Sequence, residues 1–137
     1  MLRIGVISDT HGLLRPQAAA FLRSCEHILH AGDICNADTL AQLRQIAPVT
    51  AVRGNNDNGA WAHALAETEV VPFGAILVCV LHDLAQLDIE AKAAGMHVVV
   101  SGHSHRPLIE DRNGVLFVNP AAPARGAFAC RSRSASC

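Results

Sequence analysis

The 137-residue sequence contains no tyrosine, one tryptophan and four phenylalanines, and its formal net charge is only −1. Proteins that bind single-stranded nucleic acid without sequence preference use stacking aromatic side chains and a positively charged groove. The sequence offers few aromatic residues, and no stretch of it collects Lys or Arg. We therefore expect no nucleic-acid partner, which leaves a small charged or phosphorylated molecule as a candidate ligand.

The sequence also lacks an apolar run of eighteen residues, so no membrane-spanning segment is predicted. The first apolar run stops at Asp9, which is too early for a signal peptide. Its five cysteines are odd in number and form no CxxC pair, a pattern that argues against a disulfide framework and a zinc finger. We expect reduced thiols and a cytoplasmic location.

Half of the residues are apolar and 17% are charged, as in an ordinary globular domain of this length. We predict a single domain over residues 1–128. The Arg/Ser-rich end, CRSRSASC, predicts a disordered tail over residues 129–137.

One pattern occurs five times: a short run of β-branched and apolar residues, followed by a loop that begins with side chains able to bind a metal. The five runs and their loop residues are LRIGVIS with Asp9 and His11, HILHA with Asp33, PVTAVR with Asn55, AILVCVL with His82, and HVVVSG with His103 and His105. Continuous apolar runs of this length are typical of parallel strands buried on both faces.

Helical patterns separate most of these runs. Pro16 can open one helix, Asn36 or Asp38 can cap a second, and a third is expected from Leu84 to Gly95. Alternating strands and helices predict an α/β fold with a largely parallel sheet. Two hairpins, turning at Phe73-Gly74 and Asn113-Gly114, should make the sheets mixed.

The five loops are expected to converge, because the carboxyl ends of parallel strands meet at one edge of a sheet. Seven ligand-type side chains exceed the needs of one ion but suit two ions that share a carboxylate. Nitrogen and oxygen donors without thiolate favour Mn²⁺, Fe²⁺, Zn²⁺, Co²⁺ or Ni²⁺ over Ca²⁺ or Mg²⁺.

The motifs DTH (Asp9 to His11), GD (Gly32-Asp33), GNND (Gly54 to Asp57), the strand-end His82 and GHSH (Gly102 to His105) resemble the five signatures of the calcineurin-like metallophosphoesterases. Length and spacing are most similar to the small prokaryotic phosphodiesterase branch of that superfamily. The resemblance extends from Leu2 to about Asn119 and implies a sandwich of two mixed β-sheets flanked by helices.

The resemblance also implies roles for individual residues. Asp9, His11, Asp33 and His105 would hold the first ion, and Asp33, Asn55, His82 and His103 the second. Manganese is the expected metal, with zinc, iron, nickel and cobalt as alternatives. The implied reaction is hydrolysis of a small phosphoester, most of all a phosphodiester, by a hydroxide that bridges the two ions. Asp33, Asn55 and His103 are the candidate catalytic residues, and Asn56, Arg53 and Arg106 are candidate substrate contacts.

The sequence departs from the family pattern in three places. Asn56 stands where many relatives have a histidine that can protonate the leaving group, so esters with low-pKa leaving groups should be preferred. Asp83 stands where glycine is common and can either orient a ligand histidine or cap the next turn. Ala121 and Ala122 replace a Gly-Ser pair, and we expect the last C-terminal strands to be missing, with an exposed sheet edge that favours a homo-oligomer.

Two alternatives to a phosphodiesterase remain. A nuclease is disfavoured by the near-neutral charge and the few aromatic residues. A catalytically weak or inactive binding or scaffold module on the same fold is the main alternative, because some relatives in the superfamily serve as scaffolds. The presence of all seven ligand-type residues favours the enzyme. The remaining histidines are assigned structural roles, with His30 the least certain because it lies three residues before Asp33.

Overall fold

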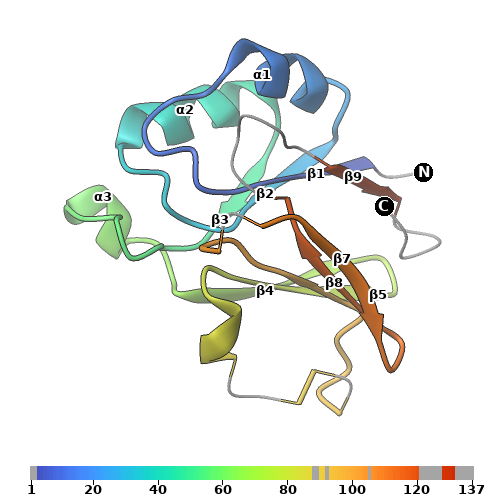
Figure 1. The fold of residues 1–137 in the computed structure, drawn as a ribbon. Coiled ribbons are helices and arrows are strands. Elements are labelled where there is room, and N and C mark those ends of the chain that lie inside the picture. Colours follow the sequence, from blue (N-terminus) through green and yellow to red (C-terminus); the bar gives the residue numbers. More distant parts are fainter. Residues whose placement is uncertain (1–2, 88–89, 92, 105, 121–127, 132–137) are drawn as a thin grey trace.

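The computed structural model describes residues 3–87, 90–91, 93–104, 106–120 and 128–131. The strands in these residues form two mixed sheets that pack face to face (Figure 1). The first sheet has the order β3-β2-β1-β9 and comprises β1 (Arg3–Ile7), β2 (His27–His30), β3 (Val49–Ala51) and β9 (Phe128–Arg131). Strands β1, β2 and β3 are parallel, and β9 runs antiparallel to β1.

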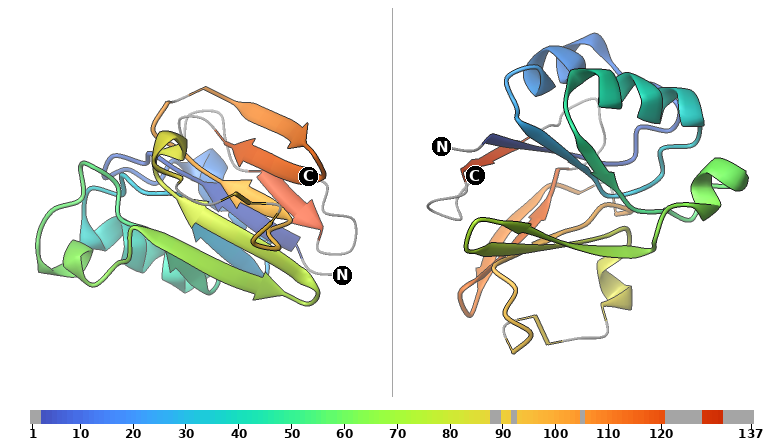
Figure 2. Two further views of the ribbon diagram at one scale, coloured as in Figure 1. Left: turned by 90° about the horizontal axis from the view of Figure 1, so that it is seen from below. Right: turned by 180° about the vertical axis from the view of Figure 1, so that it is seen from behind.

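Two helices lie on the side of the first sheet that faces away from the second sheet (Figure 2). Helix α1 (Pro16–Leu22) begins with the predicted proline, and α2 (Ala37–Ile46) is capped by Asn36, whose Oδ1 accepts the N–H of Thr39 at 2.8 Å. Both predicted helices are confirmed. Their apolar faces pack on this sheet in one buried cluster, which includes Ile7, Leu22, Ile28 and Leu43.

The second sheet has the order β4-β5-β6-β8-β7. Its strands are β4 (Thr68–Phe73), β5 (Ile76–Leu81), β6 (Val98–Val100), β7 (Leu108–Arg112) and β8 (Val115–Asn119). The parallel strands β5, β6 and β8 form its centre, and both predicted hairpins, β4-β5 and β7-β8, are confirmed. The first turns at Gly74 and Ala75, one residue later than predicted, because Phe73 still pairs with Ile76. Asn113 and Gly114 both have positive φ, 56° and 87°, as a tight two-residue hairpin turn requires.

The main core lies between the two sheets and is made of β-branched and other apolar side chains from both. It includes Ile4 and Val6 of β1, Val80 of β5, Val100 of β6 and Val118 of β8. Strands β1, β5 and β6 end at loops predicted to bind metal, so this core holds the starting points of those loops rigidly. The fold is therefore the expected sandwich of two mixed sheets flanked by helices.

The third predicted helix, Leu84 to Gly95, is wrong in extent. The structure has only a 3₁₀ turn, η1 (Leu84–Gln86), followed by turns at the described residues up to Gly95. Leu84 and Leu87 recur at the three-residue period of a 3₁₀ turn and pack on the outer face of the second sheet. A short helix, α3 (Ala60–His63), was not expected. Among the described residues, no helix is long and apolar enough to cross a membrane.

The C-terminal strands are not all missing, contrary to the expectation from Ala121 and Ala122, which themselves lie outside the described residues. Strand β9 begins at residue 128 and continues to 131, into the segment predicted to be a tail. It pairs with β1 from Arg3 with Arg131 to Val6 with Phe128, and so satisfies backbone groups that an open edge would expose. Residues 132–137 lie outside the described residues.

Candidate metal centre

The site lies where loops leave the carboxyl ends of strands in both sheets. Asp9 follows β1, Asp33 follows β2, and His82 follows β5 directly. Backbone hydrogen bonds connect the loops: the N–H of Asp9 donates to the Gly32 carbonyl at 2.9 Å, and that of Gly102 to the His82 carbonyl at 2.9 Å. The loops therefore form one connected surface at an end of the sandwich.

Four of the predicted metal ligands have a strained backbone. Asp9, His11, Asp33 and His103 have φ values of 52°, 49°, 58° and 68°, in the left-handed region that favours glycine. Each such conformation costs about 1–3 kcal/mol and persists only where the surroundings enforce it. Their concentration in three loops that meet at one place indicates a site at which side-chain direction matters more than local stability.

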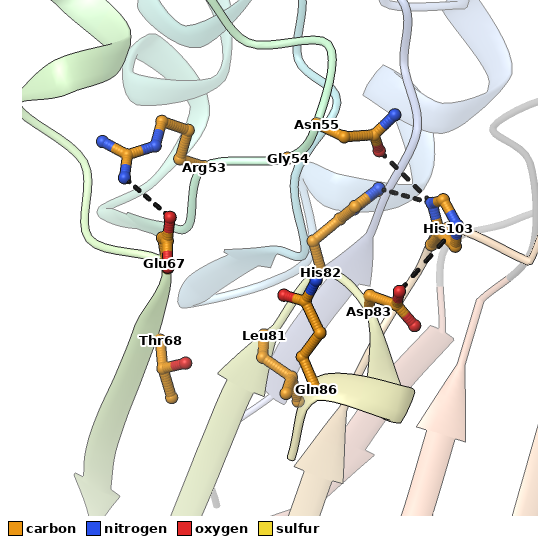
Figure 3. Close-up of a pocket in the computed structure, with 10 residues that line it drawn as sticks. All are labelled: Arg53, Gly54, Asn55, Glu67, Thr68, Leu81, His82, Asp83, Gln86 and His103. Atoms are coloured by element: carbon orange, nitrogen blue, oxygen red, sulfur yellow. Dashed lines mark hydrogen bonds and ion pairs between the residues drawn. The ribbon is translucent and has the colours of Figure 1, made fainter. Parts of the chain in front are cut away.

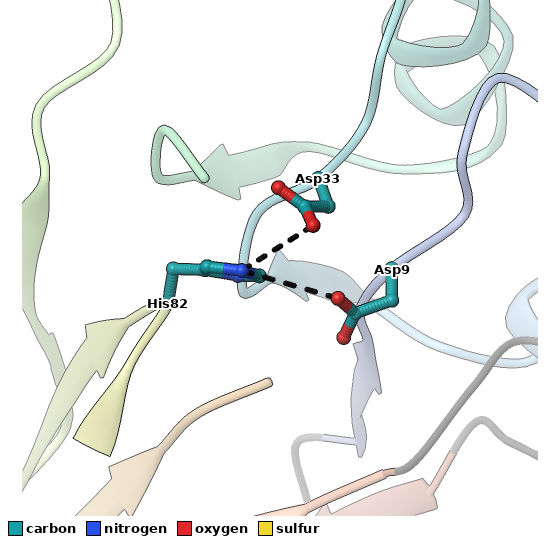
Figure 4. A group of neighbouring side chains, drawn as sticks. All are labelled: Asp9, Asp33 and His82. Carbon is teal, nitrogen blue, oxygen red and sulfur yellow. Dashed lines mark ion pairs between the residues drawn. The ribbon is translucent and has the colours of Figure 1, made fainter. Parts of the chain in front are cut away.

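Asp9, Asp33 and His82 form the centre of the site, and their side chains point toward one another (Figure 4). All three residues are buried, and one ligand atom from each lies within 4.8 Å of the others. The His82 Nε2 is 3.4 Å from Asp33 Oδ2 and 4.0 Å from Asp9 Oδ1. Two buried carboxylates and an imidazole at these distances can hold a divalent cation.

The other ring nitrogen of His82 explains how this ring is oriented. Its Nδ1 is 2.8 Å from the carbonyl oxygen of Ala31, an acceptor, so Nδ1 carries the proton and donates it. Nε2 is then the nitrogen that faces the two carboxylates and can offer a lone pair to a metal ion. Ligand histidines in metalloproteins are commonly held by such a bond from the opposite nitrogen.

His103 and Asn55 extend the site toward solvent (Figure 3). The His103 Nδ1 lies 3.2 Å from His82 Nε2 and 3.2 Å from Asn55 Oδ1. The backbone N–H of His103 also donates to Asp9 Oδ2 at 3.1 Å, which connects this loop to the buried carboxylates. The structure thus brings donors from the loops after β3, β5 and β6 to one point.

The two remaining predicted ligands differ in what the structure describes. His11 is exposed, with Nε2 4.0 Å from Asp33 Oδ2 and Nδ1 3.6 Å from the Sγ of Cys35. Burial raises the pKa of the Cys35 thiol, and the nearby Asp57 raises it further, so Cys35 remains a thiol beside this ring. His105 lies outside the described residues.

Asp57, for which the sequence predicted no role, holds the two central loops together. Its buried carboxylate accepts three backbone N–H groups, from Asp33 at 2.9 Å, Gly54 at 2.8 Å and Cys35 at 2.7 Å. The only sequence signal was an acidic residue in the GNND turn, where a carboxylate commonly bonds to its own local backbone.

His30 is a buried residue at the end of β2 that holds two loops of the site together. It is fully buried, and burial is the largest cause that lowers its pKa to about 3, so the ring is neutral. Its Nδ1 accepts the N–H of Gly32 at 3.0 Å, and its Nε2 therefore donates to Thr10 Oγ1 at 3.0 Å. The ring connects the loop of Asp9 to the loop of Asp33, which fits the structural role considered for it.

The three predicted substrate contacts lie around the centre. Asn56 donates to both carboxylate oxygens of Asp33, from its backbone N–H and from its side-chain Nδ2, each at 2.9 Å. Arg53 forms an ion pair with Glu67 at 3.0 Å. Arg106 is exposed and lines a cavity next to His103.

Comparisons with known proteins identify the family of this chain. Residues 2–134 match the calcineurin-like phosphoesterase superfamily domain. A probable metallophosphoesterase of Methanocaldococcus jannaschii is 34% identical over 133 residues, which cover 88% of this chain and 67% of that protein. A phosphodiesterase of the same organism is 26% identical over 137 residues, covering 87% and 82%. The crystal structure of Chaetomium thermophilum Vps29 superposes with a TM-score of 0.78 at 26% identity, over 93% of this chain and 76% of that one. The chain therefore belongs to the calcineurin-like phosphoesterase superfamily.

Proposed function

We propose that this protein is a phosphodiesterase that uses two divalent metal ions to hydrolyse small phosphodiesters. The observation that carries the proposal is the convergence of buried Asp9, Asp33 and His82, with His103 and Asn55 beside them. The similarity to the M. jannaschii phosphodiesterase supports the reaction class.

The donor set fits a divalent transition metal. Two buried carboxylates facing one imidazole place negative charge away from water, which costs desolvation free energy. A bound cation would offset that cost. A Cβ at Gly102 would lie 2.6 Å from Asp9 Oδ2, so the absence of a side chain there leaves room around that carboxylate. Oxygen and imidazole donors without a thiolate suit manganese, our first candidate, and zinc, iron, nickel or cobalt.

Two sets of residues would hold the ions. Asp9, His11, Asp33 and His105 form the first set, and Asp33, Asn55, His82 and His103 form the second. When bound, the ions would supply positive charge against the charge that develops on the phosphoryl oxygens, and would activate water near neutral pH.

Other groups of the chain orient the proposed ligands. Asn56 holds both oxygens of the Asp33 carboxylate, and the Ala31 carbonyl holds the His82 ring. Because an amide does not titrate, Asn56 supplies no proton to a departing alkoxide. The substrate contacts that we propose for Asn56, Arg53 and Arg106 would fix the phosphoester beside these ligands.

The proposed setting is the cytoplasm. Cys25, Cys35 and Cys79 are free thiols in the described part of the chain, which supports a reducing compartment. Association into a homo-oligomer stays a prediction.

A binding module that has lost catalysis is the second candidate. The fold is similar to that of Vps29, a protein named for vacuolar sorting rather than for a reaction. On this alternative, the protein would bind metal at the same residues and would not turn over phosphoesters.

The test is hydrolysis of bis(p-nitrophenyl) phosphate by metal-stripped protein given Mn²⁺, Zn²⁺, Ni²⁺ or Mg²⁺. The informative variant is His103→Ala, and the matched control is His63→Ala, which removes an exposed imidazole at the end of α3. We expect metal-dependent turnover in the wild type and the control, and a loss of at least about a hundredfold in His103→Ala. Folded, metal-loaded wild-type protein without turnover would favour the binding module.

A further inference from the structure

Two cavities lie on either side of Asp83 and His103, beside the candidate metal centre. The first, of about 340 Å³, is lined by residues that include Arg53, Glu67 and His82. The second, also of about 340 Å³, is lined by residues that include Leu84 and Arg106. Of the residues that the structure describes, Asp83 and His103 alone line both, so these two side chains form the wall between the cavities.

Asp83 is held in this wall by two contacts. Its Oδ1 accepts the N–H of Ala85 at 3.0 Å and so caps η1, and its Oδ2 lies 4.0 Å from His103 Nε2 (Figure 3). Its side chain is 31% exposed, so one face of the carboxylate is open to the cavities. The capping role expected from the sequence is therefore present together with an approach to the ligand histidine.

The walls of the two cavities differ in charge and polarity. In the first cavity, the positive charge of Arg53 is offset by the negative charge of Glu67, which lies 3.0 Å away. The carboxylate of Asp83 therefore gives the lining of this cavity one excess negative charge. The second has an apolar side made of Leu84, Pro107 and Leu108, and Arg106 balances Asp83 there. With histidine counted as neutral, the described residues that line each cavity carry no excess of positive charge for a dianion.

We propose that Asp83 makes this site select phosphodiester monoanions over phosphomonoester dianions, an inference that rests on the proposed function. A diester carries an organic group on each side of phosphorus, and the two cavities provide one space for each. A monoester at neutral pH carries close to two negative charges, because its second pKa is about 6. The Asp83 carboxylate repels the additional charge more than it repels the single charge of a diester.

The test is Asp83→Asn, assayed with p-nitrophenyl phosphate and with methyl p-nitrophenyl phosphate, which share a leaving group. Asparagine caps as well as aspartate, so the variant removes the charge and keeps the turn. The matched control is Asp111→Asn, which also removes a carboxylate that accepts a backbone N–H, here of Gly114 in the β7-β8 hairpin. We expect the monoester-to-diester ratio of kcat/KM to rise about fivefold in Asp83→Asn and to stay constant in the control.

A binding measurement separates this inference from the proposed function. Calorimetry on metal-loaded protein at pH 8 compares methyl phosphate with dimethyl phosphate, and metal content is measured in each variant. In Asp83→Asn, the affinity for methyl phosphate should rise about fivefold relative to dimethyl phosphate. If the wild type hydrolyses neither nitrophenyl ester, the proposed function fails, and this ratio still decides the role of Asp83.

Two results would overturn the inference. An equal loss of kcat/KM for both esters would show that Asp83 acts only by positioning His103. Unchanged ratios in both turnover and binding would show that its charge does not reach the substrate.

Discussion

The carboxylate of Asp57 accepts the backbone N–H of Asp33 at 2.9 Å, so a residue of the loop after β3 sets the position of the central residue of the loop after β2. The same carboxylate accepts the N–H groups of Gly54 and Cys35. One buried side chain thus holds the segments that carry Asp33 and Asn55 at a constant separation.

Asp57→Asn should weaken both the fold and the metal site. The amide presents an NH₂ group to at least one of the three N–H donors, and leaving a buried donor without an acceptor costs about 1–3 kcal/mol. We expect the free energy of unfolding to fall by about that amount and the affinity for Mn²⁺ to fall with it. Chemical denaturation and metal titration measure these quantities. Asp38→Asn, at an exposed site of α2, is the control, and equal behaviour of the two variants would contradict the role of Asp57.

Gly32→Ala should be much more damaging than Gly74→Ala. Both glycines have positive φ, 100° and 62°, so both substitutions strain the backbone by about 1 kcal/mol. A Cβ at Gly32 would also lie 2.8 Å from His82 Nδ1 and 2.9 Å from the Gly54 backbone, whereas one at Gly74 meets nothing within 4 Å. Thermal unfolding and metal titration should show a further loss only for Gly32→Ala. Equal losses of stability in the two variants would contradict the prediction, because the loops around Gly32 would then move to accommodate the added Cβ.

Lowering the pH should destabilise the metal-free protein through His30. The pKa of this ring falls from 6.5 to about 3 on folding, mainly because of burial. Between these values the unfolded chain binds a proton that the folded chain does not, so stability is lost as the pH falls below 6.5. The contribution approaches about 1.4 kcal/mol per pH unit. The slope of unfolding free energy against pH should be smaller in His30→Gln, with His63→Gln as control. An NMR titration of the His30 ring with a midpoint near 6.5 would contradict this account.

Turnover should depend steeply on the leaving group. Asn56 is bonded to Asp33 and cannot donate a titratable proton, and general-acid catalysis is worth about a hundredfold or more. Aryl methyl phosphates with low-pKa phenols should therefore react at least about a hundredfold faster than alkyl diesters. The measurement is kcat/KM across such a series. Alkyl esters that react as fast as aryl esters would refute the prediction.

Much of the fold could be predicted because its signals are local. Pro16 and Asn36 mark helix starts, and Asn113-Gly114 marks a hairpin, because each residue type satisfies a backbone requirement at its own position. The extent of the third helix and the pairing of β9 depend on packing against the second sheet and on the open edge of β1. Neither contact is encoded in the spacing of nearby residues.

The sequence predicted which ligand-type side chains come together better than it predicted which residues hold them in place. Ligand-type side chains after apolar runs indicated Asp9, Asp33 and His82, because parallel strands bring such positions together. The roles of Asp57 and His30 depend on which backbone amides come within reach, a consequence of loop conformation. Strained φ values at Asp9 and Asp33 likewise have no sequence signature, since the side chain needed there excludes glycine.

The most direct test of the account is a count of bound metal per chain after reconstitution with Mn²⁺, in the wild type and in Asp33→Asn. Asp33 is the residue assigned to both ligand sets. We expect close to two ions per wild-type chain and a clear loss in the variant, together with loss of bis(p-nitrophenyl) phosphate hydrolysis. A folded wild-type protein that binds no divalent ion, or an Asp33→Asn variant that keeps both ions, would contradict it.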